Sequence, residues 1–469
     1  MTAVVNDTGR VYQAGLLVLG ALLGLAGGAD PKLAIAGAIG LLFVAVVLSD
    51  LTTGVCIFTV VAFFDLLPSF GAAVFSFAKL TGLLVAIAWL ATLASGRSKG
   101  AAMSVRHPWL TVVLVGFTAW TALSMLWAEV PADSFTPFTR YALNLILVPI
   151  VFTAVTQRRH VVALIGAFVA GASVSALYGI VVPPAETTEG EPARLGGAGI
   201  EPNTFAAVLV VGFALAIALA FAPRLSPIVR GLSLAGAGCC AFGVLLSLSR
   251  GGLIALAVAL LVSVVFGGRW RAAAAGLLVL TALGTAGYFT LVATPAARER
   301  ITQPDRGAGR KDIWTVGWRM VKAHPVRGIA VGNFQPAAVH YLLKPGAIER
   351  ADLIVDQPKV AHNTYLQVLA ELGVVGLALF LGIIATCLRC ALRAAHRFRD
   401  RGEWRYELLA RALFVGLMGN LAADFFISNQ WSKQLWLLLA LGPALLAVAS
   451  RDPEDEPVKV PERRAVLVV

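Results

Sequence analysis

The sequence has few charged residues and few cysteines. Only 14% of its 469 residues are charged, and 58% are hydrophobic, against about 25% and about 45–50% in ordinary soluble proteins. This composition excludes a cytosolic enzyme, and it excludes a disordered chain, which combines low hydrophobicity with high charge. Five cysteines in a chain of this length are too few for a secreted disulfide scaffold.

The hydrophobic residues occur in blocks long enough to cross a bilayer. A spanning helix needs about 20 mainly apolar residues, so the blocks predict an all-α polytopic membrane protein with about 12–14 transmembrane helices. The short blocks near the N-terminus could merge or re-enter the membrane. The predicted spans are residues 13–28, 32–48, 51–67, 75–95, 109–127, 138–156, 161–182, 203–222, 231–248, 251–267, 272–293, 364–388, 406–428 and 433–449.

Lysine and arginine residues predict the orientation of these spans. With a cytoplasmic N-terminus, successive inside loops are basic, as the positive-inside rule requires, whereas the outside loops carry acidic residues. Both termini are therefore predicted to be cytoplasmic, without a cleavable signal peptide. The net charge of +12 thus reflects topology, and the lack of a basic helix with interleaved aromatic residues argues against nucleic-acid binding. The inside-loop residues are Arg97, Lys99, Arg106, Arg158, Arg159, Arg224, Arg230, Arg269, Arg271, Arg389, Arg393, Arg397, Arg399, Arg401 and Arg405.

The cysteines predict no special chemistry. Cys387 and Cys390 form a CxxC pair near the predicted cytoplasmic end of a helix, and one such pair is a weak indication of zinc. The other three lie in apolar segments. We expect all five to be packing residues.

One connection is much longer than the others. Residues 294–361 form a polar segment of about 68 residues between the eleventh and twelfth spans, on the predicted external side, and loops longer than about 15 residues are usually functional or disordered. The amphipathic run 312–323 predicts a helix along the membrane surface that ends at His324-Pro325. Because the segment also contains four aromatic residues, we expect a folded cap: Trp314, Trp318, Phe334 and Tyr341.

The chain therefore divides into five predicted parts. Residues 1–190 form the N-terminal transmembrane helices and residues 191–293 the central ones. Residues 294–361 form the external cap, and residues 362–450 the C-terminal transmembrane helices. Residues 451–469, which mix charges with prolines, are predicted to be a disordered cytoplasmic tail.

The first candidate site residue is Arg250, in the tract SLSRGG at residues 247–252. This tract joins two spans by a tight turn on the predicted external face, where the positive-inside rule does not explain an arginine. A guanidinium group binds two phosphate oxygens at once, and glycines would let such an anion approach the backbone. The alternative is an interfacial arginine whose head group reaches toward water.

The second candidate is His362, where the cap returns to the membrane. A histidine titrates near neutral pH and can accept a proton from a hydroxyl group. Asn363 or Thr364 can cap the helix that follows. A lone histidine is more often structural, but His362 and Arg250 are predicted on the same membrane face.

Further polar residues are predicted on or near this face. Arg194 and Asn203 precede and begin the eighth span, and Asp424 shares a helix face with Asn420. For Asp424 the alternatives are interhelical hydrogen bonding and acceptor binding. The sequence has no DxD pair, HExxH motif or Asp/His cluster typical of a metal site, so it predicts a metal-free site for an anionic lipid-linked substrate. The cap contributes Arg306, Arg310 and Arg319.

Several short motifs, taken in their order around the long loop, resemble the O-antigen ligase/polymerase superfamily. The resemblance covers roughly residues 190–430, and residues 1–190 are similar only in being serial spans. The motifs are residues 199–203 with 205–206, 247–252, 310–314, 325–328 with 332–334, and 362–366 with 371–373.

This resemblance implies a GT-C-like, cofactor-free glycosyltransferase in a bacterial inner membrane, with its active site at the external leaflet. Such proteins transfer a glycan from undecaprenyl pyrophosphate to an acceptor hydroxyl. It further implies Arg250 and Arg310 as pyrophosphate ligands, with Arg306 or Arg319 as replacements for Arg310. His362 would be the base, or the residue that orients the acceptor.

The resemblance leaves the acceptor open. A ligase passes its polymer to lipid A-core, a polymerase passes it to another lipid-linked repeat unit, and related members glycosylate protein. A flippase or transporter of lipid-linked sugars is an alternative from another class, although paired broken helices and midplane charges typical of transporters are not apparent. A non-catalytic scaffold would leave the arrangement of Arg250 and His362 unexplained.

Overall fold

The protein is an all-α polytopic membrane protein. The computed structural model describes residues 40, 42–64, 77–96, 102–182, 194–197, 200–302, 309–342, 348, 351–356 and 358–451. No strand occurs within these ranges, and seven helical stretches in them are long and apolar enough to cross a membrane.

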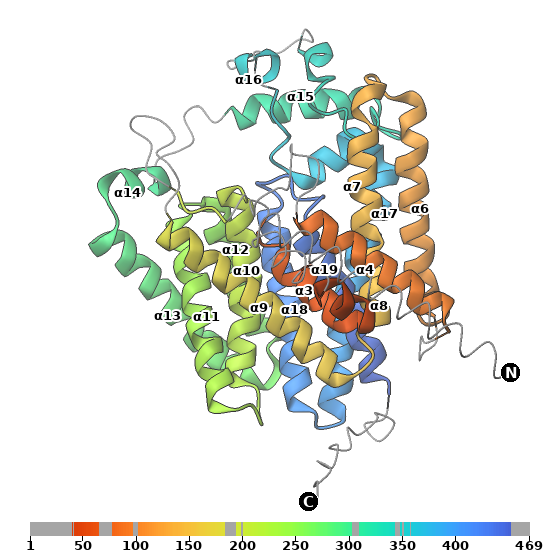
Figure 1. Ribbon diagram of the computed structural model, residues 1–469. Helices are drawn as coiled ribbons and strands as arrows, with labels where there is room; N and C mark the ends of the chain where they lie inside the picture. The colour runs from red at the N-terminus through yellow and green to blue at the C-terminus, as the bar shows by residue number, and fades with distance from the viewer. Residues whose placement is uncertain are drawn as a thin grey trace, which may run out of the picture.

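Most of the helices form one bundle, and the others lie in the connections between them (Figure 1). The bundle helices are α3 (Leu51–Val61), α4 (Phe77–Ala94), α6 (Pro108–Ser124), α7 (Phe135–Leu145), α8 (Leu147–Ala154), α9 (Arg158–Val181), α10 (Pro202–Phe221), α11 (Pro227–Leu246), α12 (Arg250–Phe266), α13 (Arg271–Gly287), α17 (Thr364–Asp400), α18 (Trp404–Ala423) and α19 (Lys433–Ala449). The connecting helices are α5 (Met103–Arg106), η1 (Met125–Trp127), η2 (Pro131–Asp133), η3 (Gly268–Trp270), the π-helix η4 (Tyr288–Val292), α14 (Pro295–Thr302), α15 (Arg310–Ala323), η5 (Ala338–Tyr341) and α16 (Asp352–Val355).

The predicted spans from residue 75 onward each correspond to helix, and two predictions need correction. Within its described residues, 51–64, the predicted span 51–67 is helical as α3, Leu51–Val61, which measures roughly 16 Å and is too short to cross a hydrocarbon core of about 30 Å. Helix α17 continues to Asp400 instead of ending at residue 388, because its arginines and alanines favour helix. The predicted span 13–28, most of 32–48 and most of the tail 451–469 lie outside the described residues.

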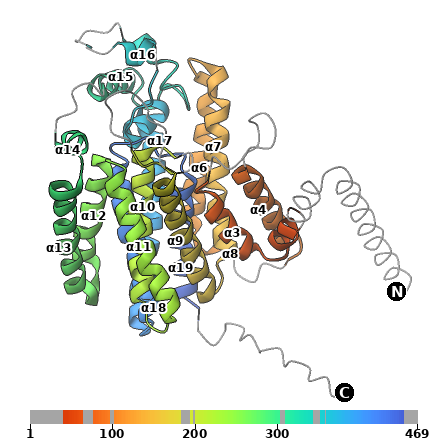
Figure 2. The same ribbon diagram turned by 60° about the vertical axis from the view of Figure 1, so that its left-hand side comes forward.

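Burial separates central helices from lipid-facing ones. Nearly every residue of α19 and most of α10 are buried, so these helices occupy the middle of the bundle. Helix α13 has no buried residue and stands at one edge, with α4 toward the other (Figure 2). Because the exposed residues of α13 include Val279, Leu280 and Leu283, this edge presents an apolar surface suited to lipid.

The cysteines lie within helices as free thiols. Cys387 and Cys390 are buried in α17, and the backbone of Cys387 packs against Gly442 of α19, where an added Cβ would overlap its carbonyl oxygen. These contacts support the packing role predicted from sequence.

Residues 309–342 and 351–356 form a folded cap across one end of the bundle (Figure 1). Its hydrophobic core includes Ile313, Val316, Met320 and Phe334. Helix α15 ends at Ala323 with His324 as its C-cap, as predicted. Its buried residues Ile313, Val316 and Met320 pack into the cap, and its position along the membrane surface stays a prediction.

The cap is fastened to α17 at a break in that helix. Gly373 has φ 67° and ψ −172°, so α17 is interrupted there, and the freed backbone groups of residues 370–374 bond to residues 325–332 of the cap. We call these two segments the clasp. The buried Glu371 carboxylate also accepts a hydrogen bond from Gly332 N at 3.0 Å. The backbone bonds are Ile329 N to Ala370 O (3.0 Å), Ala330 N to Glu371 O (2.8 Å) and Val374 N to Pro325 O (2.9 Å).

Glu129 provides a second attachment for the cap. This residue lies between η1 and η2, and its carboxylate accepts a hydrogen bond from the Tyr341 hydroxyl group and lies 3.0 Å from His340 Nδ1. Burial and the bond to Glu129 raise the pKa of Tyr341. The loop after α6 is thus tied to the same end of the bundle as the cap.

The loops predicted to be cytoplasmic meet at the other end. Arg158 forms an ion pair with Glu403 at 2.6 Å, and Arg405 donates to Pro223 O at 2.9 Å. The guanidinium of Arg269 lies 3.2 Å from the centroid of the Trp404 ring. These contacts show that the loops lie on one common side of the bundle, as the positive-inside pattern predicted.

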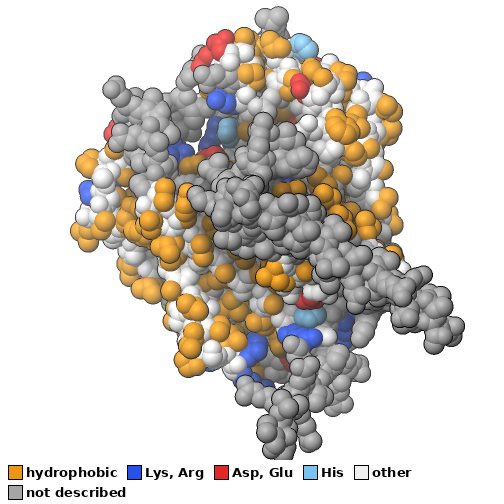
Figure 3. Space-filling view, viewed as in Figure 1, with side chains coloured by type: hydrophobic (Ala, Val, Ile, Leu, Met, Phe, Trp, Pro, Cys, Tyr) orange, Lys and Arg blue, Asp and Glu red, His pale blue; other side chains and the backbone are white. Residues whose placement is uncertain are grey.

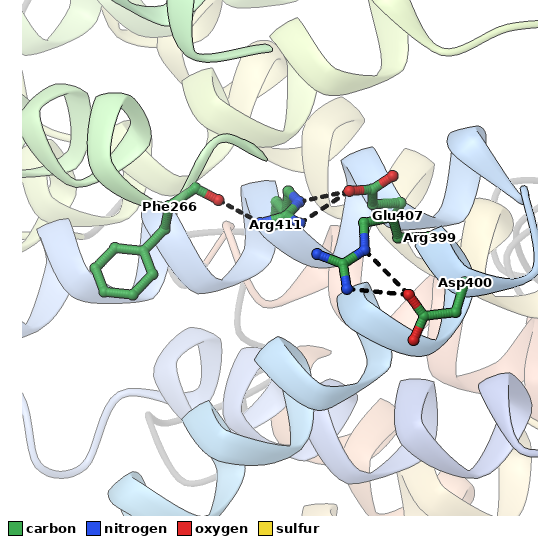
Figure 4. A network of polar contacts seen from close by, with 5 residues as sticks. All are labelled: Phe266, Arg399, Asp400, Glu407 and Arg411. Carbon is green, nitrogen blue, oxygen red and sulfur yellow. Dashed lines mark hydrogen bonds and ion pairs between the residues drawn. The ribbon is translucent and has the colours of Figure 1, made fainter. Parts of the chain in front are cut away.

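A buried ion pair also stabilises this end. Arg411 bonds to Glu407 one turn earlier on α18 at 2.9 Å, with side-chain exposures of 7% and 0%, and donates to Phe266 O at the end of α12 (Figure 4). The nearby pair of Arg399 and Asp400 is exposed. A buried charge needs a partner, and Glu407 is the partner of Arg411. The bond from Arg411 to Phe266 O joins α18 to the α12–α13 connection.

Candidate functional site

Arg250 begins α12 immediately after a tight turn. Helix α11 ends at Leu246, and Ser249 is the N-cap of α12, with its Oγ accepting from Gly252 N at 3.1 Å. Leu248 takes the left-handed conformation, with φ 49°. The turn thus fixes a half-buried arginine at a helix N-terminus, where the unpaired N–H groups and the helix dipole favour an anion.

The two glycines after Arg250 serve helix packing. A Cβ on Gly252 would lie 2.5 Å from Ala206 Cβ of α10, and a Cβ on Gly251 would lie 3.2 Å from Phe426 Cβ. These glycines therefore let α10 and the loop after α18 approach α12. Their predicted role, opening the backbone to an anion, stays a prediction beside this packing role.

Arg194 ties the turn to the start of α10. Its Nε donates to Ser247 O at 3.1 Å, and its Nη2 donates to Asn203 Oδ1 at 2.7 Å. Glu201 is the N-cap of α10 and accepts from Asn203 N at 3.0 Å and from Thr204 N at 3.1 Å. The N-termini of α10 and α12 therefore lie next to each other, as these bonds require.

His362 is held at the start of α17. Asn363 caps this helix by accepting from Leu366 N at 3.0 Å, as predicted for Asn363 or Thr364. On the other side of the histidine, Trp314 Nε1 donates to Ala361 O at 2.9 Å. His362 itself has φ 47°, a conformation that non-glycine residues seldom adopt and that is frequent at functional sites.

Thr364 anchors the same segment to the loop between α18 and α19. Its N–H donates to Asp424 O at 2.8 Å, and its hydroxyl donates to Ile427 O at 2.8 Å. The Asn429 N–H donates to the Thr364 hydroxyl oxygen, also at 2.8 Å. The backbone beside His362 is thus fixed from the cap and from the bundle.

The surroundings of His362 favour its neutral form. Burial is the main cause that lowers its pKa, and the Arg310 guanidinium lowers it further. Glu201 opposes this effect, and Lys359 adds to it. A neutral imidazole at neutral pH can accept a proton. The bond from Trp314 to Ala361 O also brings α15, which begins at Arg310, to the segment that contains His362.

Four helix N-termini therefore gather at one place below the cap: those of α10, α12, α15 and α17. Figure 3, viewed as Figure 1, shows a hollow between the positions of α15 and α12. Basic, histidine and acidic side chains lie around its rim. The combined partial charges of helix N-termini and the guanidinium groups suit a phosphate or pyrophosphate. The neutral His362 adds a proton acceptor to this anion site.

Three other predicted residues remain, and two of them have structural partners. Arg319 is buried inside the cap and donates to Tyr341 O at 2.9 Å and to Leu342 O at 3.0 Å, so it stabilises the cap. The Asp424 carboxylate is buried and accepts from Asn429 Nδ2 at 3.0 Å, which favours the interpretation as hydrogen bonding between segments. Arg306 lies outside the described residues.

Two neighbours of His362 were missed from the sequence. Glu201 was counted among scattered external acids, although an acidic residue followed by proline and asparagine is typical of a helix N-cap. Lys359 precedes His362 by three residues and had no motif to mark it. Both charges affect His362 because of the way the chain folds around α17.

A comparison with protein families matches the segment that contains most of these residues. Residues 235–381 match the family model Wzy_C, described as O-Antigen ligase. The matched segment begins in α11 and ends in α17, so it contains Arg250, Arg310, His362 and the clasp. No curated protein is significantly similar to the chain.

Proposed function

Because the chain belongs to the O-antigen ligase superfamily, we propose that it is a membrane glycosyltransferase of cell-surface polysaccharide assembly. It transfers a glycan from undecaprenyl pyrophosphate to the hydroxyl group of an acceptor. The observation that carries this proposal is the bond from Trp314 Nε1 to Ala361 O, which joins α15, the helix that begins at Arg310, to the residue before His362.

The proposed reaction breaks one bond and forms another at the anomeric carbon. The acceptor oxygen forms a bond to this carbon, the bond to the pyrophosphate oxygen breaks, and the leaving pyrophosphate keeps the electron pair. His362 accepts the hydroxyl proton or orients the hydroxyl group. Arg250 and Arg310 stabilise the charge that develops on the leaving group.

The acceptor and the cellular location are part of the same proposal. We place the protein in a bacterial inner membrane with the cap in the periplasm and both termini in the cytoplasm, as the basic loops favour. A ligase that uses lipid A-core is the first candidate, and a repeat-unit polymerase that uses a second lipid-linked glycan is the alternative.

Deletion of the gene followed by mass spectrometry of lipid-linked intermediates tests the function and separates these acceptors. We expect surface polysaccharide to be lost. Accumulation of intact lipid-linked polymer would identify a ligase, and accumulation of single lipid-linked repeats a polymerase. Unchanged polysaccharide and unchanged lipid-linked pools in the deletion strain would contradict the proposal.

The rate of transfer should depend on pH through His362. Because its pKa is lowered from the ordinary value of about 6.5, the base form dominates at neutral pH, and the rate should fall only on acidification below that value. Replacing Arg310 with glutamine removes a positive charge that lowers this pKa. We therefore expect Arg310→Gln to move the acid limb of the pH–rate profile upward, besides slowing transfer. An unshifted limb would show that Arg310 does not act on His362.

A further inference from the structure

A basic cavity lies at the end of the bundle away from the cap. It has a volume of about 490 Å³ and is lined by the start of α6, the second half of α17 and the end of α19. Its walls include Arg106, Arg389, Arg393 and Arg397. The sequence interpretation gave these arginines a topological role only, which does not account for their assembly around one cavity.

The arginines of α17 form a stripe. Arg389, Arg393 and Arg397 are four residues apart, so they lie on one face of the helix, where like charges repel. Arg397 donates to the Ser450 hydroxyl group. Within the described ranges, no carboxylate forms an ion pair with the stripe or with Arg106, which faces it from α5. A bound anion would relieve this repulsion.

The surroundings of the cavity indicate a lipid as the source of that anion. Trp109 lines the cavity and is 66% exposed, and tryptophan is enriched at membrane interfaces. Val105 and Val112, on either side of it along the chain, are 72% and 61% exposed. An apolar surface therefore continues from the cavity mouth along α6, where acyl chains would lie.

We propose that this cavity binds the phosphate of an anionic phospholipid from the leaflet on the side away from the cap. Guanidinium groups bind phosphate oxygens in pairs, and basic pockets between transmembrane helices are suited to lipid head groups. Inorganic phosphate has the same charge chemistry, but it would make no use of the apolar surface beside Trp109. The site is separate from the proposed transferase site and does not depend on it.

Native mass spectrometry of the purified full-length protein in detergent tests this proposal, with phosphatidylglycerol, phosphatidylcholine and inorganic phosphate as probes. We expect phosphatidylglycerol to bind in preference to phosphatidylcholine. The double variant Arg389→Gln/Arg393→Gln should weaken phosphatidylglycerol binding about 30-fold, because each basic residue near the membrane surface strengthens the binding of anionic lipid about 5-fold. These side chains are exposed, so the variant should keep the elution profile and thermal unfolding of the wild type.

The matched control is Arg230→Gln/Arg399→Gln, which removes the same charge from exposed positions outside the cavity. We expect it to bind phosphatidylglycerol as the wild type does. Equal weakening in both double variants would show a general effect of charge and overturn the site. Binding of inorganic phosphate as tight as that of phosphatidylglycerol would overturn the lipid as its source.

Discussion

We expect His362→Ala and Arg250→Ala each to abolish polysaccharide assembly while the protein still inserts into the membrane. A general base contributes about 10²–10⁴-fold to a rate, and one electrostatic donor to a developing anion contributes about 10²–10³-fold. Complementation of a deletion strain, with polysaccharide measured by gel and protein by immunoblot of membranes, gives the result. His362→Asn is the sharper variant, because asparagine tolerates the left-handed backbone but cannot act as the base.

Two exposed residues at the other end of the bundle provide controls for these variants. His396→Ala removes an imidazole and Arg230→Ala removes a guanidinium, and both should support normal polysaccharide. Wild-type polysaccharide in strains that carry His362→Asn and Arg250→Ala would reject the roles assigned here.

The second large effect is expected from Gly373→Ala, at the break in α17. An added Cβ would overlap the Val326 carbonyl oxygen, and the backbone of Gly373 lies in a region open almost only to glycine, at a cost of about 1–3 kcal/mol for other residues. Loss of the clasp hydrogen bonds adds about 1 kcal/mol each. If the three backbone bonds of the clasp are lost, we expect a total loss of about 4–6 kcal/mol, measured by thermal unfolding in detergent, together with faster proteolysis of the cap.

Gly402→Ala is the matched control for the clasp. Gly402 has φ 71°, and an added Cβ would meet no atom within 4 Å, so this variant carries the backbone strain without the overlap. It should cost only about 1–2 kcal/mol and leave the cap resistant to protease. If Gly373→Ala were no more disruptive than Gly402→Ala, the clasp would not be what holds the cap.

The sequence predicted the parts of the fold that depend on composition. The length of the apolar blocks predicted the helices, and the basic residues predicted that one set of loops lies on a common side. The bonds from Arg158 to Glu403 and from Arg405 to Pro223 O confirm that these loops lie together. The interruption of α17 at Gly373 could not be predicted in this way, because its cause is contact with residues 325–327, far away in the chain.

The sequence indicates the candidate residues of the site but not the contacts that hold them. Arg250 and His362 stood out because an arginine and a histidine occur at predicted external ends of spans, and Arg310 because it lies in the predicted external cap. The packing of Gly251 against Phe426 and of Gly252 against Ala206 could not be predicted, since it is a tertiary property. Arg319 was misinterpreted for the same reason, because nothing in the order of residues indicates that its guanidinium turns into the cap.

Our central claim is that this protein transfers a glycan from a lipid pyrophosphate to an acceptor and so forms a glycosidic bond, with His362 as proton acceptor. The most direct measurement uses purified protein in vesicles with a polyprenyl-pyrophosphate-linked glycan and an acceptor. The wild type should release polyprenyl pyrophosphate in step with glycosylated acceptor, and His362→Asn should release none. Movement of the intact donor between leaflets without a new glycosidic bond would contradict the claim and indicate a flippase.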